Sequence, residues 1–182
     1  MLVTQQPIFR KFWHAVMPLS HLSQGPQAFT LLGEKLVLFL DDSGQPAALQ
    51  DRCCHRTARL SKGWCVDAQG QACTQGRLRC GYHGWTYDRT GRVVQIVQYE
   101  PNRPIPTDYR THGYHCKAAY GYAWVSLEDP IADIPPIPEC GMAVSQPKSW
   151  LYQLTGCNSV GFSLTRNGDV ARDGAVIVSR NG

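Results

Sequence analysis

The chain has 182 residues, of which 43% are hydrophobic and 18% charged, so it can bury a core and is too apolar to be wholly disordered. Its net charge of +4, with no dense run of lysine and arginine, does not indicate nucleic-acid binding, although it suits an acidic partner protein. No segment approaches the roughly 18 continuous apolar residues of a membrane span, and the N-terminus lacks the apolar centre of a secretory signal. We therefore expect a cytoplasmic protein.

The first part of the chain predicts short strands. An aromatic segment at 9–17 fits either a short helix or an extended lead-in. The apolar runs 29–32 and 36–40 are separated by a glycine-containing turn and predict a hairpin. A turn cluster at 41–44 precedes a third strand at 47–50. Short strands at this spacing, without a long helical periodicity, favour an all-β fold.

Residues 52–90 differ in composition, because they are rich in Cys, His, Arg, Gly and Trp. This composition favours a small subdomain of loops that is organised by a metal rather than by a core. Strand-like segments follow at 93–99 and 119–127, and we expect Trp124 to lie in the core of the second one.

The C-terminal part of the chain changes character again. The proline-rich run 129–138 predicts an extended linker, which places a domain boundary there. The tail at 139–182 carries weak strand signals near 160–165 and 175–179 and no known motif.

Two loops each combine one cysteine with one histidine. Cys53 and His55 are spaced C-x-H, and Cys80 and His83 are spaced C-x-x-H. The chain has eight cysteines, but a disulfide framework requires an extracellular context, so cysteines beside histidines are interpreted first as metal ligands. The other six are interpreted as buried or incidental thiols: Cys54, Cys65, Cys73, Cys116, Cys140 and Cys157.

The two loops resemble the pattern of Rieske [2Fe–2S] proteins, and the flanking residues Arg56, Gly84 and Trp85 resemble the oxygenase branch of that family in particular. The resemblance implies a Rieske domain at 9–138 made of antiparallel sheets. It also implies a small rubredoxin-like cluster-binding subdomain at about 52–90.

The resemblance further implies the ligands. Cys53 and Cys80 are expected to bind one iron, and His55 and His83 the outer, solvent-facing iron. Because two neutral imidazoles replace two anionic thiolates, the potential rises from roughly −400 mV in plant-type ferredoxins to about −150 to +300 mV.

Two features qualify the match. In Rieske proteins of cytochrome bc complexes a disulfide braces the cluster, but the corresponding positions here look like Ala58 and Tyr82, so we expect no such disulfide and a potential at the lower end of the range. The 24-residue gap between His55 and Cys80 is longer than usual in the family, and we expect the extra length in a surface loop at 67–76.

The remaining aromatic and histidine residues have structural interpretations. Trp85 and Tyr87 are expected to pack beneath the two loops rather than to shield the cluster. Four histidines lack partner spacing and are expected to be surface or satisfied residues: His14, His21, His112 and His115.

The resemblance implies electron transfer from a ferredoxin or an NAD(P)H-dependent reductase toward the mononuclear iron of an oxygenase. That iron is bound by two histidines and a carboxylate in a second domain. No histidine follows His115, so mononuclear Fe(II) is not expected in this chain and a truncated oxygenase large subunit is favoured. A stand-alone Rieske-type ferredoxin is one alternative, and a zinc-stabilised binding module with no redox role is another.

Overall fold

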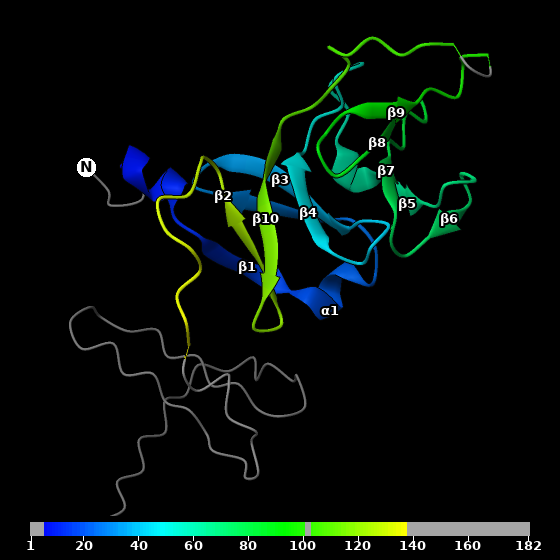
Figure 1. Ribbon diagram of the computed structural model, residues 1–182. Coiled ribbons are helices and arrows are strands. Elements are labelled where there is room, and N and C mark those ends of the chain that lie inside the picture. Colours follow the sequence, from blue (N-terminus) through cyan, green and yellow to red (C-terminus); the bar gives the residue numbers. More distant parts are fainter. Residues whose placement is uncertain (1–5, 101–102, 138–182) are drawn as a thin grey trace, which may run out of the picture. The chain divides into compact units, whose positions relative to one another are not determined.

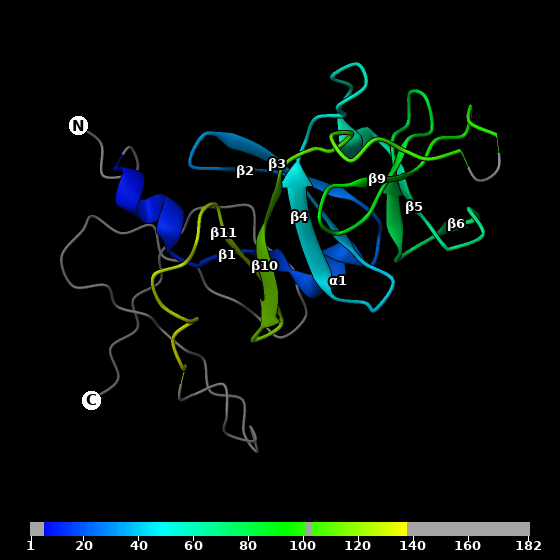
Figure 2. The same ribbon diagram turned by 45° about the horizontal axis from the view of Figure 1, so that its top comes forward.

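The computed structural model describes residues 6–100 and 103–137, and residues up to Pro136 belong to one compact unit. Its strands form two antiparallel sheets, which lie side by side in Figures 1 and 2. In the described part of the chain, no helix is long and apolar enough to cross a membrane. The expected all-β fold of antiparallel sheets is confirmed.

The larger sheet has six strands in the order β1-β11-β10-β4-β3-β2. These strands are β1 (His14–Pro18), β2 (Gln27–Leu31), β3 (Glu34–Leu40), β4 (Pro46–Gln50), β10 (Gly113–Ala119) and β11 (Tyr122–Ser126). A short 3-10 helix at Pro7–Lys11 (η2) precedes β1, and α1 (Leu19–Leu22) follows it. The aromatic lead-in is therefore helical at its start and extended at its end.

The predicted hairpin is formed by β2 and β3, which pair from Gln27↔Leu38 to Leu31↔Glu34. Its two turn residues, Leu32 and Gly33, have φ values of 47° and 87°. Positive φ at both positions is what a type I′ turn requires, and this turn matches the twist of the flanking strands.

The sequence interpretation missed β10. The segment expected as one strand at 119–127 contains the end of β10, a turn at Gly121 and β11. Trp124 is half-buried and donates from Nε1 to the Ala119 carbonyl at 2.9 Å, so it lies at the edge of the core, whereas its neighbour Val125 is fully buried.

The smaller sheet has five short strands in the order β6-β5-β7-β8-β9. They are β5 (Trp64–Val66), β6 (Ala72–Cys73), β7 (Arg77–Arg79), β8 (Thr86–Tyr87) and β9 (Val93–Gln95), with a 3-10 turn, η3 (Leu60–Lys62), before them. The expected subdomain of loops at 52–90 therefore also contains four short strands, β5 to β8, and it has an apolar core. The extra length at 67–76 also contributes the turn and second strand of a β5–β6 hairpin.

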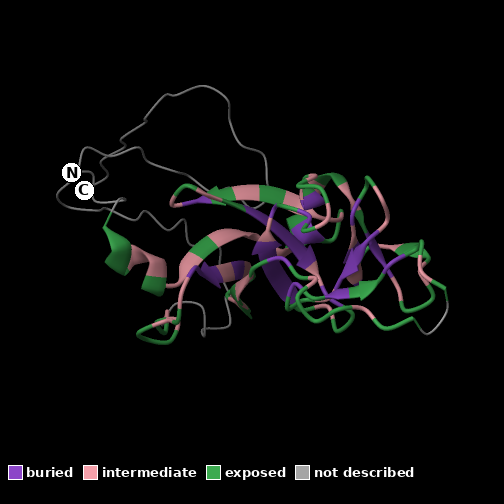
Figure 3. Cartoon of the chain, turned by 90° about the horizontal axis from the view of Figure 1, so that it is seen from above, coloured by how far each residue is buried: buried purple, intermediate pink, exposed green. Residues whose placement is uncertain are grey.

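The described residues enclose two apolar cores, and strands β3 and β4 contribute to both. Buried residues are coloured purple in Figure 3. Leu36 and Leu38 face the core beneath β1, β11 and α1, whereas Val37 and Phe39 face the core of the five-stranded sheet. Burial on both faces explains why β3 is a continuous apolar run. The predicted strands in the tail, Cys140 and Cys157 lie outside the described residues.

Candidate metal centre

The two cysteine–histidine loops have the same backbone hydrogen bonds. In each, the cysteine N–H donates to the carbonyl five residues later, and the cysteine carbonyl accepts from the N–H four residues later. These bonds join Cys53 to Ala58 (2.8 Å) and Thr57 (2.9 Å), and Cys80 to Trp85 (2.9 Å) and Gly84 (3.1 Å). Each loop is thus closed by its own main chain.

The fourth residue after each cysteine has a positive φ, 55° at Thr57 and 71° at Gly84. Glycine adopts this conformation freely, whereas for a β-branched residue it is a true outlier. The first loop therefore holds strained backbone, which is the kind of conformation that persists only where surrounding contacts fix it.

Contacts from outside fix both loops. The buried carboxylate of Asp51 accepts from the N–H and the hydroxyl of Ser61, each at 2.7 Å, which ties the start of the first loop to η3. A Cβ on Gly81 would lie 2.7 Å from the Lys62 carbonyl oxygen. The second loop therefore packs against η3 so closely that only glycine fits.

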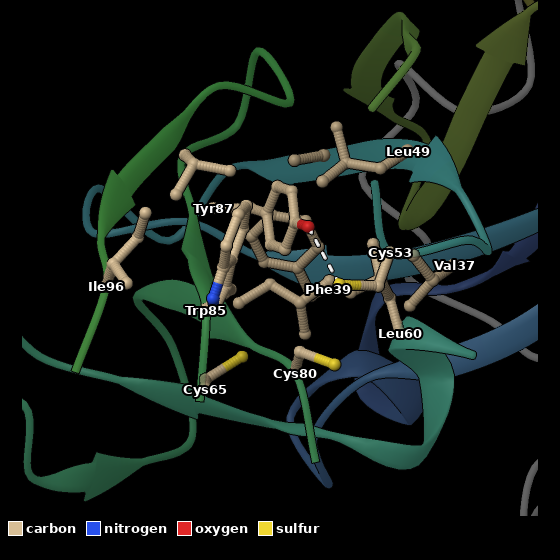
Figure 4. Close-up of a cluster of buried hydrophobic side chains, with 13 residues drawn as sticks. Val37, Phe39, Leu49, Cys53, Leu60, Cys65, Cys80, Trp85, Tyr87 and Ile96 are labelled. Carbon is tan, nitrogen blue, oxygen red and sulfur yellow. Dashed lines mark hydrogen bonds between the residues drawn. The ribbon is translucent and has the colours of Figure 1, made fainter. Parts of the chain in front are cut away.

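The two cysteine side chains meet inside the core of the five-stranded sheet (Figure 4). The Cys80 thiol donates to Cys53, and the backbone N–H groups of His55 and Arg56 also donate to the Cys53 sulfur. These donors, with the Cys80 thiol the largest cause, lower the pKa of Cys53 to about 5 against the opposing effect of burial. The charge on Cys53, together with burial, raises the pKa of Cys80, although N–H groups of the second loop donate to it. Backbone N–H groups that stabilise a thiolate favour metal binding at these sulfurs, because the thiolate is the form that binds a metal.

The two imidazoles also meet. The rings of His55 and His83 are 4.7 Å apart, edge to face. Trp85 stacks on His55 with a centroid distance of 4.5 Å and an interplanar angle of 3°. The His55 Nδ1 atom is buried, and it has no hydrogen-bond partner in the described part of the chain. A buried polar nitrogen without a partner is costly, and metal ligation is one way to satisfy it.

These residues fit a Rieske-type cluster. Two thiols form one pair and two imidazoles form the other, as a cluster with two cysteine ligands on one iron and two histidine ligands on the second requires. Among residues 6–100 and 103–137, no three His, Cys, Asp or Glu side chains are grouped so as to hold a single metal ion.

Tyr87 links the core to the first loop. Its hydroxyl lies 3.0 Å from the Cys53 sulfur and accepts the Cys54 N–H at 3.1 Å. Burial raises the pKa of Tyr87, so the phenol keeps its proton and can donate to a thiolate. The sequence interpretation treated Tyr87 as packing only and missed this bond.

The structure pairs Cys53 with Cys80 and His55 with His83. The Cys54 sulfur lies 3.3 Å from the Tyr87 hydroxyl, next to the cysteine pair. Other predicted non-ligands have partners elsewhere. His14 contacts the Phe9 carbonyl at 2.8 Å, and His115 contacts Asp129 at 3.0 Å. Cys65 is fully buried in the core, which raises its pKa to about 12. The sequence interpretation also missed Thr57, although its position four residues after Cys53 matches that of Gly84 after Cys80.

Known proteins resemble this chain in sequence. Residues 12–109 match the family model described as the Rieske [2Fe–2S] domain. Methylxanthine N1-demethylase NdmA of Pseudomonas putida is 37% identical over 131 residues, which cover 68% of this chain and 34% of NdmA. The chloroplastic protein TIC 55 of Arabidopsis thaliana is 34% identical over 114 residues, 63% of this chain and 19% of that protein. The chain spans about a third or less of the length of these relatives.

Solved structures of similar proteins superpose on this chain. Pseudomonas putida CBB5 NdmB superposes with a TM-score of 0.67 at 33% identity, covering 75% of this chain and 41% of the NdmB chain. Dicamba monooxygenase superposes with a TM-score of 0.59 at 30% identity, covering 71% of this chain and 40% of that chain.

Proposed function

Because this chain belongs to the Rieske [2Fe–2S] domain family, we propose that Cys53 and Cys80 bind one iron of such a cluster and that His55 and His83 bind the other. The observation that carries the assignment is the pairing of like ligands: the side chains of Cys53 and Cys80 meet in the core, and the His55 and His83 rings are 4.7 Å apart, with a buried Nδ1 on His55 that has no partner in the described residues. When bound, such a cluster supplies one-electron transfer at about −150 to +300 mV.

The chain's own residues suit this role. Backbone N–H groups of both loops donate to the sulfurs, which stabilises negative charge on them. Trp85 covers one face of His55 and keeps water from that face. His83 is only half-buried and lies beside Tyr82, which is 63% exposed, so the imidazole edge is the route by which a partner can reach the centre.

We further propose that electrons arrive from a ferredoxin or an NAD(P)H-dependent reductase and pass to the mononuclear iron of an oxygenase. The match to about a third of NdmA supports an interpretation of the chain as the cluster-binding part of an oxygenase large subunit. The test is to supply the full chain to an oxygenase whose own cluster ligands have been mutated. Restored turnover supports a separable carrier, and absence of turnover favours a part that acts only when joined to its catalytic domain.

Metal analysis separates this proposal from a zinc-stabilised module. The full chain should contain two irons and two acid-labile sulfides, with visible absorption and a rhombic electron paramagnetic resonance signal when reduced. One zinc and a colourless solution would support the alternative, in which four ligands surround a single ion.

The variant His83→Cys tests the ligand assignment. We expect a cluster that still assembles but has a potential lowered by at least about 100 mV, toward the roughly −400 mV of four-cysteine clusters. Voltammetry measures the shift. His115→Cys, which changes an exposed histidine of the six-stranded sheet, serves as the control and should leave the potential unchanged. An unaltered potential in His83→Cys would contradict ligation by His83.

A further inference from the structure

Five exposed cationic side chains gather around the first cysteine–histidine loop. We call them the basic face, and they are Lys35, Arg52, Arg56, Arg59 and Lys62. Arg52 and Arg56 flank the ligands Cys53 and His55, and the main chain of Lys62 touches Gly81 of the second loop. The basic face therefore borders both loops of the candidate metal centre.

The cations of the basic face are not held in ion pairs. Other cations of the molecule are paired, for example Arg89 with Asp41 at 2.7 Å and Lys117 with Asp133 at 3.4 Å. In the described part of the chain, none of the five forms an ion pair. Their positive charge is thus available to an external partner.

A hollow of about 360 Å³ lies between the β2–β3 hairpin and the first loop, and a second one of about 300 Å³ adjoins it. Lys35 and Arg59 line both hollows. Two acidic residues also line the first hollow, but both are engaged. Glu34 is paired with Arg10 at 3.2 Å, and Asp51 accepts two hydrogen bonds from Ser61. Acidic side chains of a partner can therefore enter this concave surface and meet cations.

An apolar spot lies on the second loop. Tyr82 is 63% exposed, with its ring 3.9 Å from that of His83. Val97 is 58% exposed and lies beside Gly84. An apolar spot bordered by cations is the composition of a small, transient electron-transfer interface, in which charge guides the encounter and apolar contact completes it.

We propose that the basic face is the docking surface for an acidic one-electron donor protein, whose carboxylates lie against Lys35 and Arg59 while its redox centre approaches His83. This inference rests on the proposed electron-transfer function and specifies the chemistry of the donor. Electrostatic guidance of this kind raises association rates and weakens as salt is added.

The test measures how fast an acidic plant-type [2Fe–2S] ferredoxin, chemically reduced, reduces the oxidised full-length holoprotein in stopped-flow experiments. In Lys35→Glu/Arg59→Glu we expect the second-order rate constant at low salt to fall on the order of 10-fold, with loss of its salt dependence. Lys35→Gln/Arg59→Gln should give an intermediate rate. Neither residue is a proposed ligand, so the visible spectrum should be unchanged.

A matched control is Lys11→Glu/Lys117→Glu, which makes the same change in net charge at exposed positions on η2 and β10. It should retain the wild-type rate within about two-fold. The small cationic reductant methyl viologen radical should reduce the Lys35→Glu/Arg59→Glu variant as fast as the wild type or faster, because the repelling charge is gone.

Three results would overturn the docking proposal: a wild-type rate in the Lys35→Glu/Arg59→Glu variant, an equal loss of rate in the control, or inhibition by inorganic phosphate far beyond that of sodium chloride at equal ionic strength. The last would identify the hollow as a small-anion site. If methyl viologen reduces the holoprotein but the rate of reduction by ferredoxin does not depend on Lys35 and Arg59, the docking proposal is refuted and the proposed function is not. A chain that assembles no cluster refutes the proposed function itself.

Discussion

The two sheets of this molecule are stabilised by different means. The six-stranded sheet has strands of five to seven residues and encloses a core of aliphatic side chains beneath α1. The five-stranded sheet has strands of two or three residues, and its core contains the thiols of Cys53 and Cys80. Because the proposed cluster would bind these thiols and the buried Nδ1 of His55, we infer that the smaller sheet depends on the metal more than the larger sheet does.

Removing the metal should therefore separate the two regions. With a chelator and a reductant, we expect amide hydrogen exchange to accelerate strongly across β5 to β9 and the two loops, whereas β2, β3, β10 and β11 keep most of their protection. Hydrogen exchange with mass spectrometry measures this region by region. Equal loss of protection in both sheets would show that the two sheets depend on the metal to the same extent.

The next largest effects come from matched truncations, one in each core. Leu38 and Leu78 are both fully buried, Leu38 beneath α1 and Leu78 in β7 beside the candidate metal centre. Each change to Ala should lower the free energy of unfolding by about 2–5 kcal/mol. Only Leu78→Ala should also lower the cluster content.

Urea denaturation followed by circular dichroism, together with visible absorbance of the same samples, measures both quantities. A folded Leu38→Ala protein that has lost its visible absorbance would contradict the independence of the two cores.

Periodicity and turn chemistry predicted the hairpin of β2 and β3 and the strand β4, because alternating burial and a glycine turn act locally. Strand β10 was missed because its sequence, GYHCKAA, has no branched aliphatic residue, and all seven of its positions are half-buried or exposed. Its pairing with β4 and β11 is fixed only by tertiary contacts. In the candidate site, the spacing of Cys and His pointed to the residues that the fold pairs, Cys53 with Cys80 and His55 with His83.

The side chains that support the two cysteine–histidine loops could not be predicted from sequence spacing. The hydroxyl of Tyr87 reaches Cys53 across 34 positions of sequence, and Asp51 reaches Ser61 across ten. Such bonds depend on how β8 and η3 pack against the loops, and no local pattern encodes them. Of the five-stranded sheet, only β9 lies in a segment predicted as a strand, and β5 to β8 were missed for a related reason, because runs of two or three residues are too short to show alternation.

Tyr87 offers a smaller and more specific test of the smaller sheet. Tyr87→Phe keeps the packing of the ring but removes the hydrogen bond to Cys53, which stabilises the more negative, reduced state of a cluster. A lost bond of about 1.4 kcal/mol lowers a one-electron potential by roughly 60 mV. Voltammetry measures the shift, and Tyr114→Phe on β10 is the control that should leave the potential unchanged. A shift in both variants would mean that the potential responds to general packing.

The smallest expected effect concerns Asp41 in the turn between β3 and β4 of the six-stranded sheet. Burial would raise its pKa, but hydrogen bonds from Ser43 and Gln45 and the charge of Arg89 outweigh burial and lower the pKa below its ordinary value. A carboxylate with a lowered pKa stabilises the fold at higher pH, and this contribution is lost as the pH falls through its folded pKa.

The wild-type protein should therefore lose stability between about pH 5 and about pH 2 more steeply than Asp41→Asn, in urea denaturation at a series of pH values. Asp42→Asn is the matched control, since Asp42 is exposed and its ion pair with Arg77 is long, at 3.7 Å. Its profile should follow the wild type. The cluster potential should be the same in all three proteins, because the turn stabilises a sheet that folds by apolar burial rather than by metal binding. A potential that changed with Asp41→Asn would show that this turn and the candidate metal centre are coupled through β3 and β4.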